Sequence, residues 1–176
     1  MRKSKVKVYD NGNKAWFLNG RLHREDGPAV EEANGHKEWW LNGLRHRQDG
    51  PAIEDADGHK YWYFNDKRHR LDGPACEYPN GRKEWFLNGN LHREDGPAIE
   101  SENGDKSWWL NGLLHRTDGP ACELAGGYKY WYFNDKRHRE DGPAYECVNG
   151  DKKWFLNGKE YTEEKFLKII NETEKV

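Results

Sequence analysis

The motif His-Arg-x-Asp is the part of this sequence that could do chemistry. A histidine can act as a general base, and a nearby carboxylate can orient its ring. The motif begins at His23, His46, His69, His92, His115 and His138. A catalytic site is needed only once, whereas a residue present in every copy of a repeat is structural or belongs to a multivalent surface. We therefore expect His and Asp to hydrogen-bond the loop and its turn. We expect Arg to pair with the recurrent glutamates, which are Glu31, Glu54, Glu77, Glu100, Glu123 and Glu146.

Other chemistry is not indicated. No nucleophile–base constellation and no phosphate-binding glycine motif stands out. Histidines repeated at every second strand would lie about 10 Å apart, too far to share an ion whose ligands lie at about 2.0–2.1 Å. Cys76 and Cys122 occupy the position held by Val30 and Ile53 in other copies, which predicts small buried side chains. We expect no enzyme activity, no catalytic residues, no metal and no cofactor.

A 23-residue repeat must position all of these residues. Asp-Gly-Pro-Ala begins at Asp26 and returns at a constant step up to Asp141, and a tryptophan keeps the same step from Trp16 to Trp154. Six copies are complete, with a half unit at each end. The residue after each tryptophan follows a cycle of Phe, Trp and Tyr, so each copy is most like the third copy after it.

The unit contains two turn signals and two strand-like segments. Asn34-Gly35 and its equivalents favour a type I′ hairpin, and a second turn such as Asn19-Gly20 or Asn65-Asp66 closes the tryptophan strand. We predict an all-β fold, an elongated antiparallel meander of tandem 23-residue β-hairpin repeats with about fourteen short strands. Residues 1–160 form a single tandem-repeat domain, and residues 161–176 form a C-terminal capping helix and tail. The helix runs from about Glu163 to Asn171, with Thr162 as its N-cap.

The repeated spacing of Trp, Asn-Gly and His-Arg-x-Asp-Gly-Pro-Ala resembles the MORN repeat, whose units are also 23-residue β-hairpins. It is more similar to MORN-variant units found in repeat proteins of bacteriophages and large DNA viruses. The resemblance covers about residues 6–160. It implies the hairpin architecture and a viral protein that acts on a host factor. The standard unit has Gly-x-Gly where this chain has Asp-Gly-Pro-Ala, so lipid contact is not carried over.

Composition narrows the classes of partner. Only 34% of the 176 residues are hydrophobic, yet the chain has nine Trp, nine Tyr and six Phe, which argues against disorder. Its formal net charge is −2, so we do not expect a nucleic acid partner. We see no apolar run long enough for a membrane span and no secretory signal. An odd number of cysteines, three, is no disulfide framework. We expect a cytoplasmic protein.

The two faces of the tryptophan strand differ. Side chains alternate along a strand, so Trp16 shares one face with Leu18, and we predict that this face is the core. The opposite face carries a different aromatic residue in each copy, beside polar or mixed neighbours, and this row is a candidate binding surface. Its candidate residues are Trp40, Tyr63, Trp109 and Tyr132. The alternative is that the helix or a curled sheet covers this row.

Two basic clusters interrupt the repeat, Lys67-Arg68 and Lys136-Arg137. Each lies beside a Tyr-Trp-Tyr-Phe strand, and aromatic residues with cations can hold an anionic partner. The alternative is a solvated turn charge paired with Asp66 or Asp135. We predict a non-enzymatic scaffold that binds a protein partner through its aromatic row. A small anionic ligand or nucleotide held by the Lys-Arg clusters is a second hypothesis. A homo-oligomer assembled through the sheet edges is a third.

Overall fold

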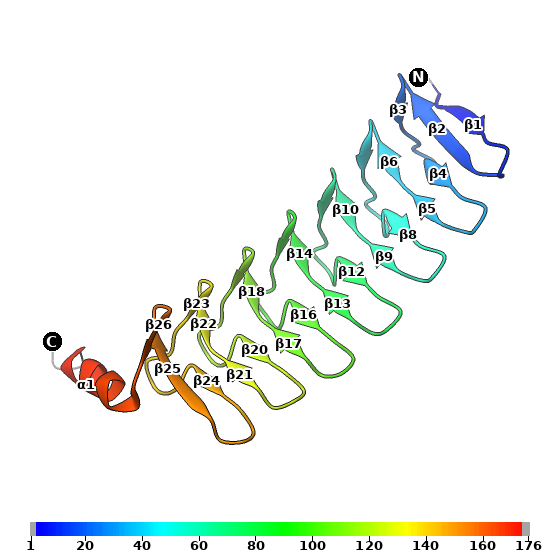
Figure 1. The fold of residues 1–176 in the computed structure, drawn as a ribbon. Helices are drawn as coiled ribbons and strands as arrows, with labels where there is room; N and C mark the ends of the chain where they lie inside the picture. The colour runs from blue at the N-terminus through cyan, green and yellow to red at the C-terminus, as the bar shows by residue number, and fades with distance from the viewer. Residues whose placement is uncertain (1–2, 174–176) are drawn as a thin grey trace. The chain divides into compact units, whose positions relative to one another are not determined.

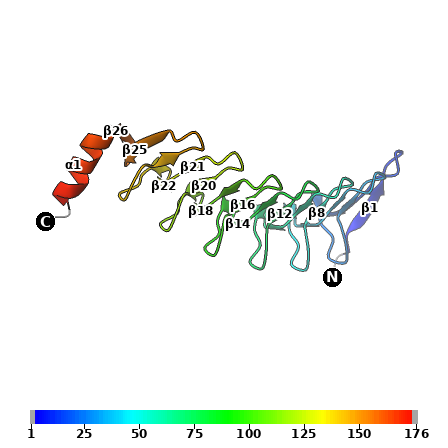
Figure 2. The same ribbon diagram turned by 90° about the horizontal axis from the view of Figure 1, so that it is seen from below.

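The computed structural model describes residues 3–173. The fold is mostly β, an antiparallel meander of many short strands with a single C-terminal helix, which confirms the predicted fold class (Figure 1). The chain divides into two compact units, Met1–Asn90 and Leu91–Val176. Within each unit, successive repeats lie side by side in the same orientation, as Figure 2 also shows. The predicted tail beyond Thr173 lies outside the described residues.

The first unit contains the half unit, the first three repeats and the beginning of the fourth. Its meander runs β1-β2-β4-β5-β8-β9-β12-β13. These strands are β1 (Lys5–Val8), β2 (Lys14–Leu18), β4 (Val30–Glu31), β5 (Lys37–Glu38), β8 (Ile53–Glu54), β9 (Lys60–Tyr61), β12 (Cys76–Glu77) and β13 (Lys83–Glu84). The strands beside the meander are β3 (Arg21–Leu22), β6 (Trp40–Leu41), β7 (Leu44–Arg45), β10 (Tyr63–Phe64), β11 (Lys67–Arg68) and β14 (Phe86–Leu87). One short strand, β15 (Asn90–Leu91), spans the boundary.

The second unit repeats this arrangement. Its meander runs β16-β17-β20-β21-β24-β25-β26. These strands are β16 (Ile99–Glu100), β17 (Lys106–Ser107), β20 (Cys122–Glu123), β21 (Lys129–Tyr130), β24 (Tyr145–Glu146), β25 (Lys152–Leu156) and β26 (Lys159–Tyr161). The side hairpins consist of β18 (Trp109–Leu110) with β19 (Leu113–Leu114), and of β22 (Tyr132–Phe133) with β23 (Lys136–Arg137).

Each repeat contains two hairpins rather than the one that we predicted. The segment 37–41 divides at Trp39, because β5 pairs with β4 and β8 whereas β6 pairs with β7. The Trp39 amide donates to the Ala52 carbonyl at 2.8 Å, and its carbonyl accepts from the His46 amide at 3.0 Å. The strand therefore changes partners at the tryptophan. For this reason the described residues contain 26 short strands instead of about fourteen.

The type I′ turn lies at the other end of the repeat from the one predicted. Asn19 and Gly20 both have positive φ, 51° and 77°, and join Leu18 to Arg21 by a two-residue loop. At Asn34-Gly35 only the glycine has positive φ, 97°. The Glu32 amide donates to the His36 carbonyl, and three residues separate this pair. A three-residue loop takes a type I turn followed by a left-handed glycine, so the type I′ prediction was wrong there.

The buried core consists mainly of alanines. The alanine of every Asp-Gly-Pro-Ala segment is fully buried, whereas the tryptophans are half-buried. The Ala29 amide donates to the Glu38 carbonyl, and its carbonyl accepts from the Trp16 amide. Ala29 is therefore bonded on both sides, to the strand that carries Trp16 and to the strand that carries Glu38, and a small side chain fits between them. The prediction that the tryptophan face is the core was therefore wrong.

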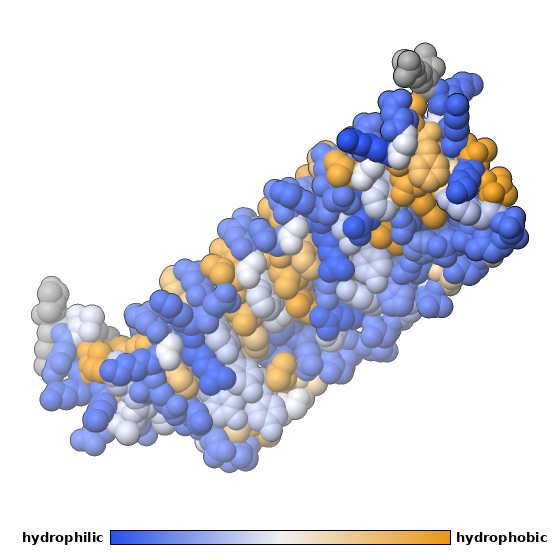
Figure 3. Space-filling view, turned by 45° about the horizontal axis from the view of Figure 1, so that its top comes forward, coloured by the Kyte–Doolittle hydropathy of each residue, from blue (hydrophilic) through white to orange (hydrophobic). Residues whose placement is uncertain are grey.

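Lysine and glutamate alternate across the strands on the face that carries Trp16. Lys14 lies opposite Glu31, Glu31 opposite Lys37, and Lys37 opposite Glu54. Opposite charges in direct cross-strand pairs contribute roughly 0.2–1 kcal/mol each. We call this face the charged face and the opposite one, which carries Phe17, the aromatic face. In Figure 3, hydrophobic side chains lie in short patches between hydrophilic ones.

The C-terminal helix α1 (Glu163–Thr173) packs against β25, as predicted. The Thr162 hydroxyl accepts from the Lys165 amide at 3.4 Å, and Glu163 and Glu164 lie in the first turn. Both features suit a helix N-terminus. Phe166 is 2% exposed and anchors the helix.

Candidate functional site

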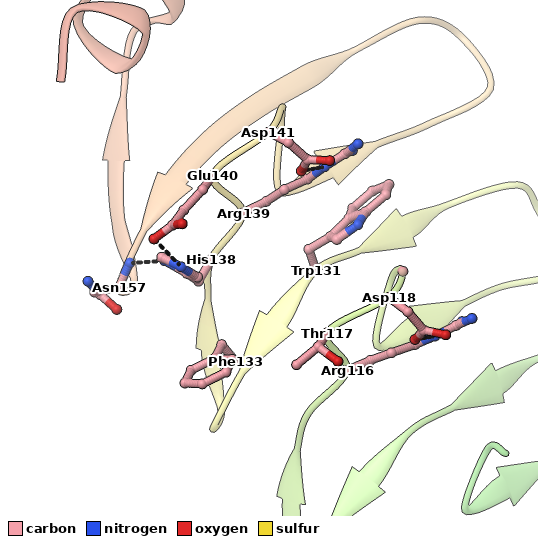
Figure 4. Close-up of a pocket in the computed structure, with 11 residues that line it drawn as sticks. Arg116, Thr117, Asp118, Trp131, Phe133, His138, Arg139, Glu140, Asp141 and Asn157 are labelled. Atoms are coloured by element: carbon pink, nitrogen blue, oxygen red, sulfur yellow. Dashed lines mark hydrogen bonds and ion pairs between the residues drawn. The ribbon is translucent and has the colours of Figure 1, made fainter. Parts of the chain in front are cut away.

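The His-Arg-x-Asp motif forms an arginine cluster rather than an acid–base pair. Arg139 lies over the Trp131 ring, with 4.1 Å between its Cζ and the ring centroid (Figure 4). Its Nε donates to Asp141 at 2.7 Å, and one terminal nitrogen donates to the Pro143 carbonyl and to Glu146, both at 3.2 Å. The same contacts recur at Arg24, Arg47, Arg70 and Arg116. The predicted Arg–Glu pair is confirmed. The aspartate accepts a hydrogen bond from the arginine and not, as we expected, from the loop and its turn.

The arginine also explains the glycine in Asp-Gly-Pro-Ala. A Cβ atom on Gly73 would lie 2.9 Å from the Cζ of Arg70, and the other five copies are equally close, at 2.8–3.1 Å. These glycines do not have positive φ. They recur because the guanidinium lies directly against the backbone, between it and the indole ring.

The histidine links each repeat to the next. Nδ1 of His23 accepts from the Asn42 amide at 3.0 Å, and His69, His92 and His138 accept in the same way from an amide 19 residues later. In His46 and His115 the partner is the side chain of that asparagine. In His138 the other nitrogen, Nε2, faces Glu140 at 3.4 Å. Both ring nitrogens are then occupied, so this ring is not poised to take a proton from a substrate.

A groove separates neighbouring loops on the charged face of the second unit. It has a volume of about 940 Å³ and is lined by Trp131, Phe133 and His138 together with the loop residues around Arg116 and Arg139 (Figure 4). The hydrogen bond from Arg116 holds the pKa of Asp118 below its ordinary value, and Arg139 does the same for Asp141. The groove is therefore bordered by carboxylates that stay ionised and that already bind the neighbouring arginines.

The aromatic face carries the predicted binding residues in an ordered row. In the first unit, Arg45 lies between Trp40 and Tyr63, with its Cζ 5.4 Å and 4.7 Å from the two ring centroids. The Trp40 indole also donates to Glu38 at 2.6 Å. Both aromatic side chains are half-buried. The row is thus fixed by contacts along its own length while part of each ring faces solvent.

The second unit presents the equivalent residues. The Trp109 indole donates to Ser107 at 2.8 Å. The Tyr132 hydroxyl accepts from Nε of Arg137 at 3.2 Å, and both aromatic side chains are half-buried. Phe155, further along the same row, is buried, at 7% exposed. The alternative of a covered row therefore fits Phe155 but not Trp109 or Tyr132.

The two Lys-Arg clusters divide into an exposed and a half-buried residue. Lys67 and Lys136 are exposed at the turns, whereas Arg68 and Arg137 are half-buried and lie over aromatic rings. The Cζ of Arg68 is 5.2 Å from the Phe86 ring centroid, and that of Arg137 is 5.3 Å from the Phe155 centroid. The paired lysine and arginine therefore do not act together at one point.

The sequence did not indicate a carboxylate–histidine network in the second repeat. Nδ1 of His36 lies 2.6 Å from Asp55, and its Nε2 lies 3.0 Å from Glu38. Burial opposes protonation of this ring, but the hydrogen bonds with Glu38 and Asp55 outweigh it, so the pKa of His36 lies above its ordinary value. The signal available was the spacing of His36 and Glu38, two residues apart on one face.

Among residues 3–173 no group of three or more His, Cys, Asp or Glu side chains is arranged to hold a metal ion. Within that same range, no helix has the length and apolar character needed to cross a membrane. No protein-family model matches the chain, and no curated protein shows significant similarity to it. The functional argument therefore depends on the geometry of the aromatic face.

Proposed function

We propose that this protein is a non-enzymatic scaffold that binds a protein partner through its aromatic face. The observation that carries the proposal is the row in which guanidinium groups alternate with half-exposed rings, as Arg45 does between Trp40 and Tyr63. Trp, Tyr and Arg are the residues that dominate binding energy in protein interfaces. Rings already held by neighbouring side chains lose little conformational freedom when a partner binds.

The repeats support a partner that contacts several of them. Trp40 and Tyr63, equivalent residues of successive repeats, both contact the guanidinium of Arg45, so the rings of neighbouring repeats lie next to each other along the row. A partner that lies along the row would meet one aromatic side chain at each step. We include in the proposal the setting that the MORN-like resemblance implies, a viral protein that acts on a host factor in the cytoplasm.

The test is affinity capture with the tagged protein from a lysate of candidate host cells. We expect one stoichiometric protein, which is lost when Trp40→Ala and Trp109→Ala are combined. Loss of two interface tryptophans typically weakens binding by about 2 kcal/mol or more for each hot spot. The matched control is Leu71→Ala, because Leu71 is 84% exposed and lies outside the aromatic row. A partner that the double variant still retains would refute the proposal.

Self-assembly is a second candidate, favoured by the exposed edge strand β1. Val6 and Val8 in this strand are 52% and 63% exposed, and β1 pairs with β2 along one side. An edge strand with exposed valines can pair with another chain, although its lysines oppose this. Sedimentation at increasing concentration tests the idea, and a strict monomer at high concentration would exclude it.

A further inference from the structure

The two basic clusters lie beside strands whose charges are arranged in opposite ways, because Arg82 and Glu84 of the first unit correspond to Asp151 and Lys153 of the second. In the first unit, Glu84 lies beside Arg68 and Arg82, with the nearest nitrogens 3.9 Å and 2.7 Å from its carboxylate oxygens. The Tyr78 hydroxyl donates to the same carboxylate at 3.1 Å. The Glu84 side chain is only 9% exposed. This carboxylate therefore occupies a cationic, tyrosine-lined position within the repeat.

In the second unit the residue equivalent to Glu84 is a cation. Lys153 stands where Glu84 stands in the first unit, and Arg137 stands where Arg68 does, each three repeats later. Among the described residues, no carboxylate lies within 4.0 Å of Arg137, and Lys153 has only Glu160, at 4.0 Å and itself 55% exposed. The carboxylate of Asp151, which stands where Arg82 does in the first unit, accepts from the side-chain amide of Asn149 at 2.9 Å. The basic side chains are thus left without a buried counter-charge.

A pocket is present at this point. It has a volume of about 560 Å³ and is lined by Tyr130, Arg137, Tyr145, Asp151, Lys152 and Lys153. Tyr145 lies directly across from both Tyr130 and Lys153 in the sheet. The Tyr130 and Tyr145 ring centroids are 5.2 Å apart, and the Arg137 Cζ lies 5.5 Å from the Tyr130 centroid. The Arg137 guanidinium therefore lies beside the Tyr130 ring, and Lys153 lies on the strand next to that of Tyr145.

We infer that this pocket binds the phosphate of a phosphorylated tyrosine side chain carried by the protein partner. In the first unit Arg68 lies near the carboxylate of Glu84. In the second unit Lys153 replaces that carboxylate, and the phosphate lies between Arg137 and Lys153, on the side of the pocket away from Asp151. A phosphate monoester carries nearly two negative charges, which match the side chains of Arg137 and Lys153. The half-buried rings of Tyr130 and Tyr145 suit the aryl group that bears it. This inference rests on the proposed scaffold function and names the chemistry of its partner.

The probe is N-acetyl-phosphotyrosine amide, titrated against the whole protein by calorimetry, beside the unphosphorylated amide, inorganic phosphate and AMP. We expect the phosphotyrosine probe to bind at least about tenfold more tightly than the unphosphorylated one, because charged hydrogen bonds are lost without the phosphate. Inorganic phosphate should compete with it, and AMP should bind more weakly. Tighter binding of AMP, or no competition by phosphate, would overturn the inference.

The repeats provide the matched variants. Lys153→Glu copies the residue of the first unit, and Arg137→Leu copies Leu91 and Leu114 of other repeats, so both changes are native to this position. Each should weaken the probe by about tenfold or more. Conversely, Glu84→Lys should create a second site in the first unit. Unchanged affinity in both loss variants would overturn the inference. If the probe fails in this way but capture of the protein partner is still lost in the Trp40→Ala, Trp109→Ala variant, the scaffold proposal stands without the phosphotyrosine site.

Discussion

Replacing Gly73 by alanine should destabilise the protein only while Arg70 is present. The backbone at Gly73 is not left-handed, so alanine is conformationally acceptable there. The new Cβ would lie 2.9 Å from the Cζ of Arg70 and must displace the guanidinium. That group donates to Asp72 at 2.9 Å, to the Pro74 carbonyl at 3.2 Å and to Glu77 at 2.9 Å, and it covers the Trp62 ring at 4.1 Å.

The magnitude follows from the contacts that the guanidinium would lose. A hydrogen bond to a charged group contributes about 1.5–3 kcal/mol, and a cation over a partly buried ring contributes about 0.5–2 kcal/mol. Gly73→Ala should therefore cost about 1–3 kcal/mol of unfolding free energy, and Arg70→Ala about 2–4 kcal/mol. In the Arg70→Ala background, Gly73→Ala should instead stabilise by about 0.4–1 kcal/mol, because alanine reduces the entropy of the unfolded chain.

Urea denaturation followed by tryptophan fluorescence measures this double-mutant cycle. The coupling free energy between the two sites, the difference between the effects of Gly73→Ala with and without Arg70, should be about 1.4–4 kcal/mol. Gly81→Ala is the control, since Gly81 has a φ of 78° and should be destabilising in both backgrounds. If Gly73→Ala costs the same with and without Arg70, the glycine recurs for another reason and the stacking argument fails.

Two further predictions concern titratable groups. The raised pKa of His36 means that its contribution to stability is complete below the unfolded value of about 6.5 and is lost as pH rises through the higher folded value. The unfolding free energy of the native protein should therefore fall between pH 6 and pH 8 more than that of Asp55→Asn, and equal falls would contradict the His36 network. Burial raises the pKa of the Cys76 thiol to about 12, so a thiol reagent at pH 8 should label Cys76 only after unfolding. Rapid labelling of Cys76 in the native protein, identified by mass spectrometry, would show that the strand opens.

The repeat made the fold class predictable, but not the pairing within each repeat. The constant step of the repeat and the asparagine–glycine turns lead directly to stacked hairpins. The partner exchange at Trp39 depends on the Ala52 carbonyl, which lies beyond the next loop in sequence and comes close only in the folded sheet. The type of the Asn34-Gly35 turn also depends on the length of its loop. That length is set by the pairing of Glu32 with His36, which leaves three residues between them. Sequence patterns give the residues of a turn but not this register.

The sequence predicted which aromatic residues lie on the candidate binding face, but it did not predict where the charged side chains lie among them. The alternation along the tryptophan strand placed Trp40 and Tyr63 on the aromatic face, where they lie half-buried. The position of Arg45 between those rings depends on the cross-strand pairing of Trp40 with Arg45. Likewise, the difference between Glu84 and Lys153 has meaning only once Arg68 and Arg137 are known to lie beside those positions.

The contrast between the two faces bears on where function can evolve in this chain. The side chains that recur in every copy, the Trp, Arg, Asp and Glu of the arginine cluster, bond to one another on the charged face and its loops. This cluster is the same in each copy, whichever residues stand on the aromatic face. Residues there, such as Tyr61, Glu84 and Ser107, can therefore differ between copies while the hairpins persist. Substitutions on the aromatic face should consequently change binding with small effects on stability, whereas substitutions in an arginine cluster should do the reverse.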